Sequence, residues 1–261
     1  MLTEQRPRMQ LFEEPRQAMG RRDEASESAS SRGHRSDPGG LLHSRPRVRN
    51  DDDTGLRGVR EPLAAGAVLL RGFALDAGDE LLAAVREVTE AAPFRHMVTP
   101  GGFTMSVAMT NCGSAGWVTD RTGYRYDAID PVSGKPWPPM PPVFSELAGM
   151  AAAEAGFEGF APDACLINRY EPGAKLSLHQ DKNEADFTAP IVSVSLGLTA
   201  VFLFGGLNRG DRQLRVRMTH GDVAVWGGPA RLFYHGVMPL KEGWHPTLGR
   251  QRLNLTLRKA L

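Results

Sequence analysis

Side chains in two stretches of the C-terminal half of the chain repeat with a period of two, loosely in the first and strictly in the second. Residues 176–182 read LSLHQDK, and residues 251–258 read QRLNLTLR. Side chains two apart on a strand point to the same face, so this period of two predicts a strand in each stretch. In the second stretch the leucines share one face and the polar side chains share the other. From Cys165 onward the pattern predicts mostly strands.

Upstream of these strands, an apolar stretch is followed by residues at helical spacing. Residues 61–73 read EPLAAGAVLLRGF, which predicts an apolar strand with Gly66 as a turn ahead of it. Apolar residues then recur every three or four positions over 77–91. This spacing predicts an amphipathic helix capped by Asp76 or Asp79.

A less regular segment separates this helix from a second one. Residues 94–142 are rich in Gly, Pro and aromatic residues and show little periodicity. Such composition predicts loops or short hairpins, where binding residues tend to gather. Over about 142–155, Phe144, Leu147 and Ala151 recur at helical spacing, so a second helix is expected there.

The first 58 residues differ in composition from the rest of the chain. Positions 1–60 hold 12 Arg and no Lys against 10 acidic residues, and the remainder holds 19 basic and 20 acidic residues. Low hydrophobicity with mixed charge predicts a disordered, Arg/Ser-rich extension over 1–58 and a folded domain over 59–261. A nucleic-acid-binding tail is the alternative, which the nearly cancelling charges disfavour.

Composition also limits the class of protein. With 261 residues, 41% of them hydrophobic, the chain can build one large domain. No apolar stretch approaches membrane-spanning length, and no signal-peptide core follows Met1. Cys112 and Cys165 are too few for a disulfide framework and are expected to be small core residues. We therefore expect a cytoplasmic protein with no membrane role.

The first alternating stretch carries candidate metal ligands. His179 and Asp181 are two apart, so both side chains would point to one face and could bind one ion. His235 follows RLFY and would close another strand. Two imidazoles and one carboxylate leave three positions of an octahedron open for a bidentate cosubstrate and dioxygen, as non-haem Fe(II) oxygenases require. The alternative for any single histidine is a hydrogen-bonded core or surface imidazole.

A second HxD string, at positions 220–222, fits a turn better than a metal site. Gly221 stands between His220 and Asp222 and just before the apolar run VAVW. Glycine suits a turn that leads into a strand and weakens a strand interior. We therefore expect no metal at this string.

The polar face of the last alternating stretch holds Arg252, Asn254, Thr256 and Arg258. A strand buried on both sides does not direct two guanidinium groups inward without an anion to meet them. A dicarboxylate cosubstrate is such an anion, because Arg forms bidentate, charge-assisted pairs with carboxylates. The alternative is a solvated polar face on an edge strand.

Several motifs together resemble the AlkB family of Fe(II)/2-oxoglutarate dioxygenases, from about residue 61 to the end. They are NRYEPGAKLSLHQDK (168–182), PIVSVSLGL (190–198), FGGL (204–207), HGDVAVWGG (220–228), RLFYHGV (231–237) and NLTLR (254–258). Upstream, TPGGFTMSVAMTNCGSAGW (99–117) resembles the substrate-covering region of the bacterial repair members. The resemblance implies an α+β fold with a double-stranded β-helix (jelly-roll) core, supporting helices and a substrate-binding lid at about 94–142. It also implies that HGD is a structural turn.

The resemblance implies Fe(II), 2-oxoglutarate and dioxygen as cofactors. Fe(II) would be held by His179, Asp181 and His235. The carboxylates of 2-oxoglutarate would pair with two arginines and accept further hydrogen bonds from neighbours; these residues are Arg252, Arg258, Asn168, Tyr170 and Asn254. The metal and cosubstrate supply the reactivity, and the protein orients the target.

The resemblance also implies a substrate and its contacts. The reaction would be oxidative demethylation of 1-methyladenine and 3-methylcytosine in single-stranded or locally opened DNA. It would proceed by hydroxylation of the methyl group and release of formaldehyde. The enzyme would be a monomer, and RNA stays open as a further substrate. A flipped base needs a stacking partner on each face, which would be Trp117 and the ligand His179. Further substrate contacts would be Tyr124, Met109, Lys182, Asn183 and Arg209. Any of these alone could instead be a core or surface residue.

One departure from the family motif concerns base preference. Bacterial repair members commonly carry Asp where this chain has Asn183, in HQDKN. A carboxylate there can accept a hydrogen bond from an exocyclic amine, whereas neutral Asn offers both donor and acceptor.

Two other functions stay open from the sequence. An Fe(II)/2-oxoglutarate oxygenase of a protein or small molecule is supported by the near-neutral charge of the domain, because strong nucleic-acid binders usually show a basic surface. A jelly-roll metal-binding module without turnover is the other, but it would have no need of two arginines directed at a dicarboxylate.

Overall fold

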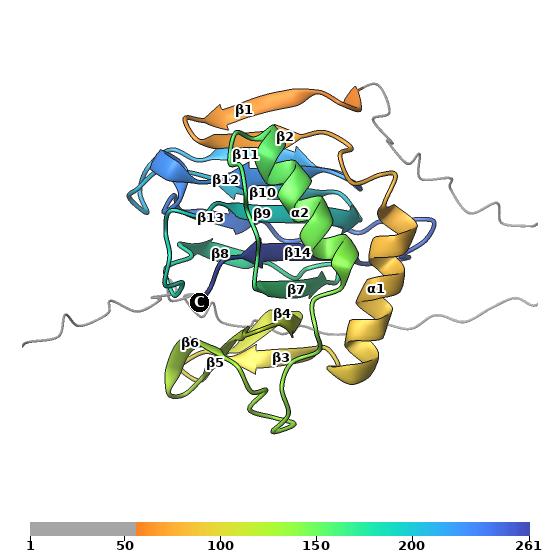
Figure 1. Ribbon diagram of the computed structural model, residues 1–261, viewed down its shortest axis with the longest axis vertical. Coiled ribbons are helices and arrows are strands. Elements are labelled where there is room, and N and C mark those ends of the chain that lie inside the picture. Colours follow the sequence, from red (N-terminus) through yellow and green to blue (C-terminus); the bar gives the residue numbers. More distant parts are fainter. Residues whose placement is uncertain (1–55) are drawn as a thin grey trace, which may run out of the picture. The chain divides into compact units, whose positions relative to one another are not determined.

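The computed structural model describes residues 56–261 (Figure 1). Most of the extension predicted at 1–58 lies outside the described residues. Two α-helices and fourteen strands occur within the described range. The helices are α1 (Gly78–Ala91) and α2 (Pro142–Glu154). The strands are β1 (Arg60–Ala64), β2 (Ala67–Leu70), β3 (Arg95–Val98), β4 (Thr104–Gly113), β5 (Gly116–Asp120), β6 (Gly123–Asp127), β7 (Ala164–Tyr170), β8 (Leu176–His179), β9 (Ile191–Gly197), β10 (Ala200–Phe204), β11 (Leu214–Met218), β12 (Val223–Trp226), β13 (His235–Val237) and β14 (Arg252–Arg258).

The strands form two antiparallel sheets and a separate hairpin. The large sheet has the order β1-β2-β12-β9-β14-β7-β4-β3, the small sheet has the order β11-β10-β13-β8, and β5 pairs with β6. Aromatic side chains such as Phe202, Phe204 and Trp226 fill the core between the sheets. This is the α+β arrangement with a two-sheet core that the resemblance implied.

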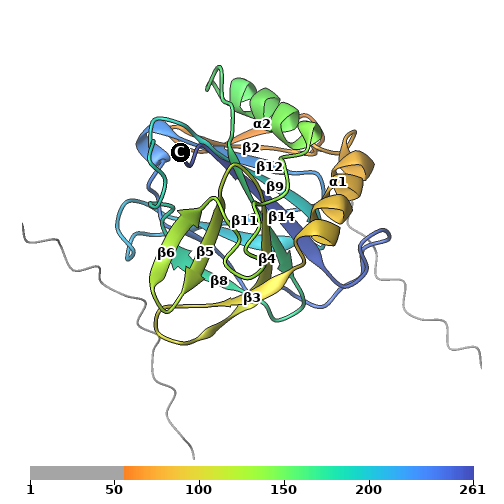
Figure 2. The same ribbon diagram turned by 60° about the horizontal axis from the view of Figure 1, so that its bottom comes forward.

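Both helices cover the outer face of the large sheet (Figures 1 and 2). Leu253, Leu255 and Leu257 of β14 belong to the same core cluster as buried residues of α1 and α2. The alternation of β14 therefore sends its leucines toward the helices and its polar side chains toward the small sheet. No helix among residues 56–261 is long and apolar enough to cross a membrane.

Strand β14 lies in the middle of the large sheet, between β9 and β7, and all seven of its residues are buried. The alternative of a solvated edge strand is therefore wrong. Cys112 and Cys165 lie directly opposite each other on β4 and β7 as buried free thiols, as expected of core residues.

The helices begin and end close to the predicted positions, but the predicted cap does not form. The N-cap residue of α1 is Ala77, and no side chain caps the helix. Asp76 pairs with Arg57 instead, and Asp79 lies within the first turn. The stretch at 61–73 also differs, because β1 and β2 form a hairpin whose turn contains Gly66 at a φ of +79°.

The segment over 94–142 is more regular than predicted. Strands β3 and β4 join the edge of the large sheet, and the ten-residue β4 pairs with β7. Only β5 and β6 form a short hairpin of their own. Strand β4 could not be recognised from the sequence, because apolar and polar side chains do not alternate along it. The six residues before Gly113 are all buried, on both faces of the strand.

Candidate metal centre

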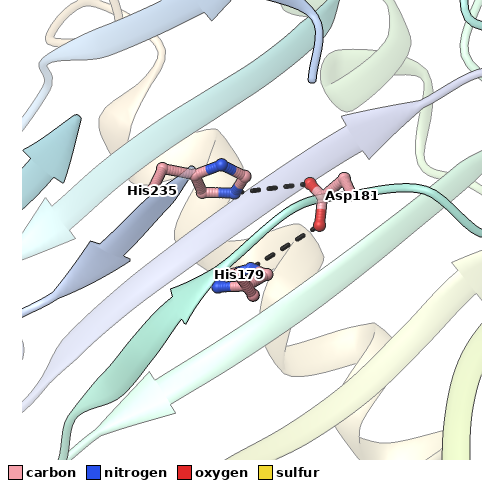
Figure 3. A group of neighbouring side chains, drawn as sticks. All are labelled: His179, Asp181 and His235. Atoms are coloured by element: carbon pink, nitrogen blue, oxygen red, sulfur yellow. Dashed lines mark ion pairs between the residues drawn. The ribbon is translucent and has the colours of Figure 1, made fainter. Parts of the chain in front are cut away.

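Three predicted ligands lie together between the two sheets. Nε2 of His179 is 3.6 Å from Oδ1 of Asp181, and Nε2 of His235 is 3.6 Å from Oδ2 (Figure 3). Among residues 56–261 this is the one group of three or more potential metal ligands whose ligand atoms all lie within 4.8 Å of one another. Two imidazoles and a carboxylate around one point are the donor set of non-haem iron sites.

The ligands reach this point from strand ends rather than from strand interiors. Strand β8 ends at His179, so Asp181 lies just beyond the strand and not within it as predicted. Strand β13 begins at His235, so the prediction that His235 closes a strand is wrong. Because β13 and β8 are antiparallel with His235 opposite His179, the two imidazoles meet across one sheet.

Gly236 permits the close approach of these two strands. A Cβ at this position would lie 2.7 Å from the backbone oxygen of Leu176 and 3.2 Å from the nitrogen of Leu178. Real Cβ atoms essentially never come that close to backbone, so a larger residue would push β13 away from β8. The pairing of these strands is also irregular between His235 and Val237.

Backbone carbonyls set the tautomer of both histidines. Nδ1 of His179 is 2.9 Å from the oxygen of Ser177, and Nδ1 of His235 is 2.9 Å from the oxygen of Phe233. A carbonyl only accepts, so each Nδ1 carries the proton and each Nε2 offers its lone pair toward Asp181. Such partners fix the orientation of metal-binding imidazoles.

The protonation states also suit metal binding. Burial, followed by the neighbouring His235, lowers the pKa of His179 to about 4, so this imidazole is neutral at neutral pH. Burial alone would raise the pKa of Asp181, but the Arg258 guanidinium holds it well below its usual range. The centre therefore presents the neutral imidazole of His179 and an ionised carboxylate, the forms that bind metals.

Arg258 pairs with the candidate ligand Asp181. Its Nε and Nη2 lie 3.0 and 2.7 Å from Asp181 Oδ2, and its Nε lies 3.4 Å from Oε1 of the buried Glu184. Arg231 reaches the other oxygen of Glu184 at 3.3 Å and donates to the backbone oxygen of Asp181 at 2.8 Å. Two arginines thus balance two buried carboxylates at the centre.

Arg252 faces the same inner space without an anion. Its Nε donates to Ser195 Oγ at 3.0 Å, and its guanidinium lies 5.1 Å from the ring centroid of Tyr170. Nη1 of Arg252 and the hydroxyl of Tyr170 are buried and have no hydrogen-bond partner among residues 56–261. A buried cation and a buried hydroxyl without partners fit a carboxylate that arrives with a ligand. The residues present therefore fit one end of a dicarboxylate.

Two asparagines lie beside this position. Asn168 of β7 and Asn254 of β14 are opposite each other, with Asn168 Nδ2 3.4 Å from Asn254 Oδ1. Asn254 also donates to Ser193 Oγ and to the backbone of Val194. The sheet therefore brings together on its inner face all five residues predicted to contact 2-oxoglutarate.

The predicted substrate residues fall into three groups. Trp117 and Tyr124 of the β5–β6 hairpin stack with ring centroids 5.7 Å apart, and Trp117 Nε1 donates to Asn183 Oδ1 at 3.3 Å. Met109 is 1% exposed and packs in the core between the sheets. The remaining two, Lys182 and Arg209, are exposed, with Arg209 in the loop between β10 and β11.

The second HxD string forms a turn. Gly221 has a φ of +84°, which favours glycine. Asp222 accepts from the backbone nitrogens of Gly72 and Thr219 and pairs with Arg71, and the string lies outside the metal group. The interpretation of HGD as a structural turn is confirmed.

Sequence reasoning missed three residues around the centre, of which Arg231 and Glu184 are buried and Tyr126 is half-buried. Tyr126 donates from its hydroxyl to Glu184 Oε1 at 2.8 Å, and burial raises its pKa well above 10, so it remains a donor. Arg231 and Glu184 complete the network described above. The available signals were Tyr126 standing two positions after Tyr124 on one strand, and Glu184 following HQDKN directly.

Comparisons with known proteins agree with this geometry. The family described as the 2OG-Fe(II) oxygenase superfamily matches residues 66–258. The chain is 62% identical over 201 residues to the alpha-ketoglutarate-dependent dioxygenase AlkB of Escherichia coli (strain K12), covering 77% of this chain and 93% of that protein. It is 35% identical over 130 residues to the human nucleic acid dioxygenase ALKBH1, covering 49% of this chain and 33% of that protein.

A solved structure has the same fold. The structure of OsALKBH1 matches with a TM-score of 0.67 and 30% sequence identity, covering 77% of this chain and 99% of the other. The jelly-roll core and the Fe(II), 2-oxoglutarate and dioxygen cofactors implied by the resemblance are thereby confirmed. The chain belongs to the AlkB family of the 2OG-Fe(II) oxygenase superfamily and is an alpha-ketoglutarate-dependent dioxygenase.

Proposed function

We propose that this dioxygenase removes methyl groups from ring nitrogens of nucleobases, with 1-methyladenine and 3-methylcytosine in single-stranded or locally opened DNA as substrates. RNA is a further candidate, since the human relative is named a nucleic acid dioxygenase. The observation that carries the proposal is the bond between Trp117 and Asn183, because Asn183 is two residues from Asp181. An aromatic ring of the β5–β6 hairpin thus lies close to the candidate metal centre.

A base held at this position would stack between two rings. Trp117 would cover one face and His179 the other, as base flipping requires. Tyr124 stacks on the indole, and Asn111 holds the Trp117 backbone through two hydrogen bonds of 3.0 Å. The exposed Lys182 and Arg209 would meet phosphates, which position a strand without reading its sequence.

We assign the cofactors to the residues described above. His179, Asp181 and His235 would hold Fe(II), and Arg252 with Tyr170 would bind the distal carboxylate of 2-oxoglutarate. When bound, the metal and cosubstrate supply an oxidant derived from dioxygen that hydroxylates the N-methyl carbon while 2-oxoglutarate becomes succinate and carbon dioxide. The hydroxymethyl group then leaves as formaldehyde, and the base is restored.

The protein's own contribution is orientation and charge. The carbonyls of Ser177 and Phe233 hold the Nδ1 protons of the two histidines, which keeps each Nε2 directed at the metal position. Arg258 holds Asp181 ionised and fixes its carboxylate. The aromatic residues of the hairpin would bring the methyl carbon to the metal and exclude other positions of the base.

We further propose residues 59–261 as the catalytic domain and about 94–142 as its lid. The lid assignment is supported by the contacts of the β5–β6 hairpin with Asn183 and Glu184. We propose a monomer that acts in the cytoplasm. The two buried thiols, Cys112 and Cys165, are compatible with a reducing compartment. Sedimentation of the purified protein would test the monomer.

The test is turnover of defined oligonucleotides. The enzyme with Fe(II), 2-oxoglutarate and dioxygen should release succinate and formaldehyde with short single strands carrying 1-methyladenine or 3-methylcytosine. The unmethylated strand should give neither product above background. His235→Ala should abolish both products and the visible charge-transfer band formed anaerobically by Fe(II) and 2-oxoglutarate.

Two results would contradict the proposal. If methylated and unmethylated strands stimulate succinate release equally, the substrate is not a methylated base, and a protein or small molecule takes its place. If His235→Ala keeps the charge-transfer band while His220→Ala loses it, the metal centre is wrongly assigned.

A further inference from the structure

Phe187 is an exposed aromatic residue in the loop that joins β8 to β9. It is 41% exposed, and the same loop carries the candidate metal ligand Asp181 near its beginning. Single exposed apolar residues are common on proteins, so exposure alone assigns no role to this ring. What distinguishes Phe187 is how the ring is held and what lies beside it.

The guanidinium of Arg231 covers one face of the Phe187 ring, 5.3 Å from its centroid. Arg231 is itself 3% exposed and is bound by the loop on three sides. It donates to the backbone oxygens of Asp181 at 2.8 Å and Ala189 at 3.1 Å, and it pairs with Glu184 at 3.3 Å. A cation over an aromatic face attracts the ring. Phe187 therefore rests on a fixed group with one face, and its exposure belongs to the other.

The loop backbone is fixed on both sides of Phe187. Asp186 accepts hydrogen bonds from the backbone nitrogen of Thr188 at 2.8 Å and from its hydroxyl at 2.6 Å. The backbone nitrogen of Ala185 donates to the oxygen of Ala260 at 3.0 Å. A side chain already held in one orientation loses little conformational entropy when a ligand packs on it. The free face of Phe187 is thus a preorganised flat apolar surface.

This surface lies near the proposed position of the methylated base. Arg231 contacts both the Asp181 backbone and the Phe187 ring, so these two are on the order of 10 Å apart, about three steps of a stacked strand at ~3.4 Å each. Lys182 of the same loop is exposed and forms no ion pair among residues 56–261. A flat apolar face beside a free cation fits an unstacked nucleobase and its phosphate.

We propose that Phe187 is a second stacking platform, which binds an unmethylated base about one to three nucleotides from the methylated one. The base lies on the face opposite Arg231, and Lys182 meets a phosphate of the same strand. The inference rests on the proposed function, because it needs a nucleic-acid strand at the metal centre. A base in a duplex already stacks on its neighbours, so this platform favours single strands. A purine presents a larger face than a pyrimidine and should bind there more tightly.

Two substitutions separate stacking from covering Arg231. Phe187→Leu keeps an apolar side chain over the guanidinium but removes the aromatic face, whereas Phe187→Trp keeps an aromatic face. Trp244→Leu is the matched control, because Trp244 is 61% exposed in the segment between β13 and β14. Its neighbour Gly243 lies near Leu198, at the end of β9 away from this loop.

The test measures binding of short methylated single strands by fluorescence anisotropy. The full chain is loaded with Fe(II) and 2-oxoglutarate under anaerobic conditions, so that no turnover occurs, and salt is fixed because phosphate contacts depend on it. An abasic nucleotide replaces, one at a time, each of about three nucleotides on either side of the methylated base. In the wild type, loss of the base at one position should raise Kd about fivefold to a hundredfold.

The variants then show whether that base meets Phe187. Phe187→Leu should raise Kd for the intact strand by a similar factor, and the abasic nucleotide at the same position should then raise it no further, because the two changes remove one contact. Phe187→Trp should bind at least as tightly as the wild type. Trp244→Leu should bind like the wild type and keep its sensitivity to the abasic nucleotide.

Several outcomes would overturn the inference. One is equal binding by Phe187→Leu and the wild type, and another is additive losses at every abasic position, since the base and the ring then do not meet. An equal loss in Trp244→Leu, or weaker 2-oxoglutarate binding in Phe187→Leu, would assign the effect to the surface in general or to the support of Arg231. Absence of turnover on methylated strands would contradict the proposed function instead, and the abasic comparison, which measures binding alone, would still decide the role of Phe187.

Discussion

Replacing Arg252 with methionine should separate cosubstrate binding from folding. Arg252 is 2% exposed, and burial lowers its pKa because no carboxylate lies beside it. Its Nη1 has no partner among residues 56–261. A buried cation without an anion is costly, and the 2-oxoglutarate carboxylate would supply that anion.

The expected loss of 2-oxoglutarate affinity in Arg252→Met follows from the carboxylate of the cosubstrate, which loses its arginine partner. Truncating one member of a buried charged pair costs roughly 2 to 5 kcal/mol, which is about 30-fold to several-thousand-fold in Kd. Tyr170 still offers its hydroxyl in the variant, so we expect the lower part of this range. Stability should change in the other direction. Replacing a buried ion pair with apolar side chains is often neutral or stabilising by about 1 to 4 kcal/mol, and Arg252 has no anion to leave behind, so the metal-free variant should be no less stable than the wild type.

The assay is a titration of 2-oxoglutarate into the Fe(II) protein under anaerobic conditions, followed by the charge-transfer band, with thermal unfolding of the metal-free protein alongside. Arg250→Met is the matched control, because Arg250 is exposed and pairs with Glu242 at 2.7 Å. Such a surface pair contributes at most about 1 kcal/mol to stability. The control should bind 2-oxoglutarate like the wild type.

Two outcomes would refute this reasoning. Unchanged 2-oxoglutarate affinity in Arg252→Met would mean that another group binds the distal carboxylate. Weaker binding together with a loss of several kcal/mol in the stability of the metal-free protein would mean that Arg252 serves the fold. Arg258→Met should behave differently, because Arg258 holds Asp181, and its loss should appear first in metal affinity.

Three further predictions follow from the same centre. Gly236→Ala would place a Cβ 2.7 Å from a backbone oxygen of β8, so Co(II) affinity, measured by absorption titration, should fall by about tenfold or more; an unchanged affinity would show that β13 can shift freely. Tyr126→Phe removes a hydroxyl that donates to buried Glu184 at 2.8 Å, so the free energy of unfolding measured in urea should fall by about 1 to 3 kcal/mol. A smaller fall would mean that water replaces the hydroxyl. The lowered pKa of His179, about 4 against 6.5 unfolded, means that the unfolded chain binds more protons between these values. Metal-free protein should therefore lose about 3 kcal/mol of stability as pH falls from 6.5 to 4, and His179→Gln should remove this dependence.

The sequence by itself determined the features that depend on local period. The alternation in 251–258 assigns leucines and polar residues to opposite faces whatever surrounds the strand, because successive side chains on a strand must point apart. The helical spacing of α1 and α2 likewise predicted their bounds to within one residue. The HxD spacing determined that His179 and Asp181 lie close to each other, because only one residue separates them along the chain.

Tertiary structure decided everything that depends on which segments meet. The position of β14 between β7 and β9 decides that its arginines are buried, and no local pattern distinguishes this from an edge strand. The β13–β8 register, with Gly236 at the close approach, decides that His235 meets His179. Arg252 and Arg258 occupy equivalent positions in the alternating pattern of β14. Arg252 nevertheless lies against Tyr170 and Arg258 against Asp181, because the two arginines are six residues apart along the strand. The orientation of the Asn183 amide depends on Trp117, 66 residues away, and such long-range contacts exist only after the chain has folded.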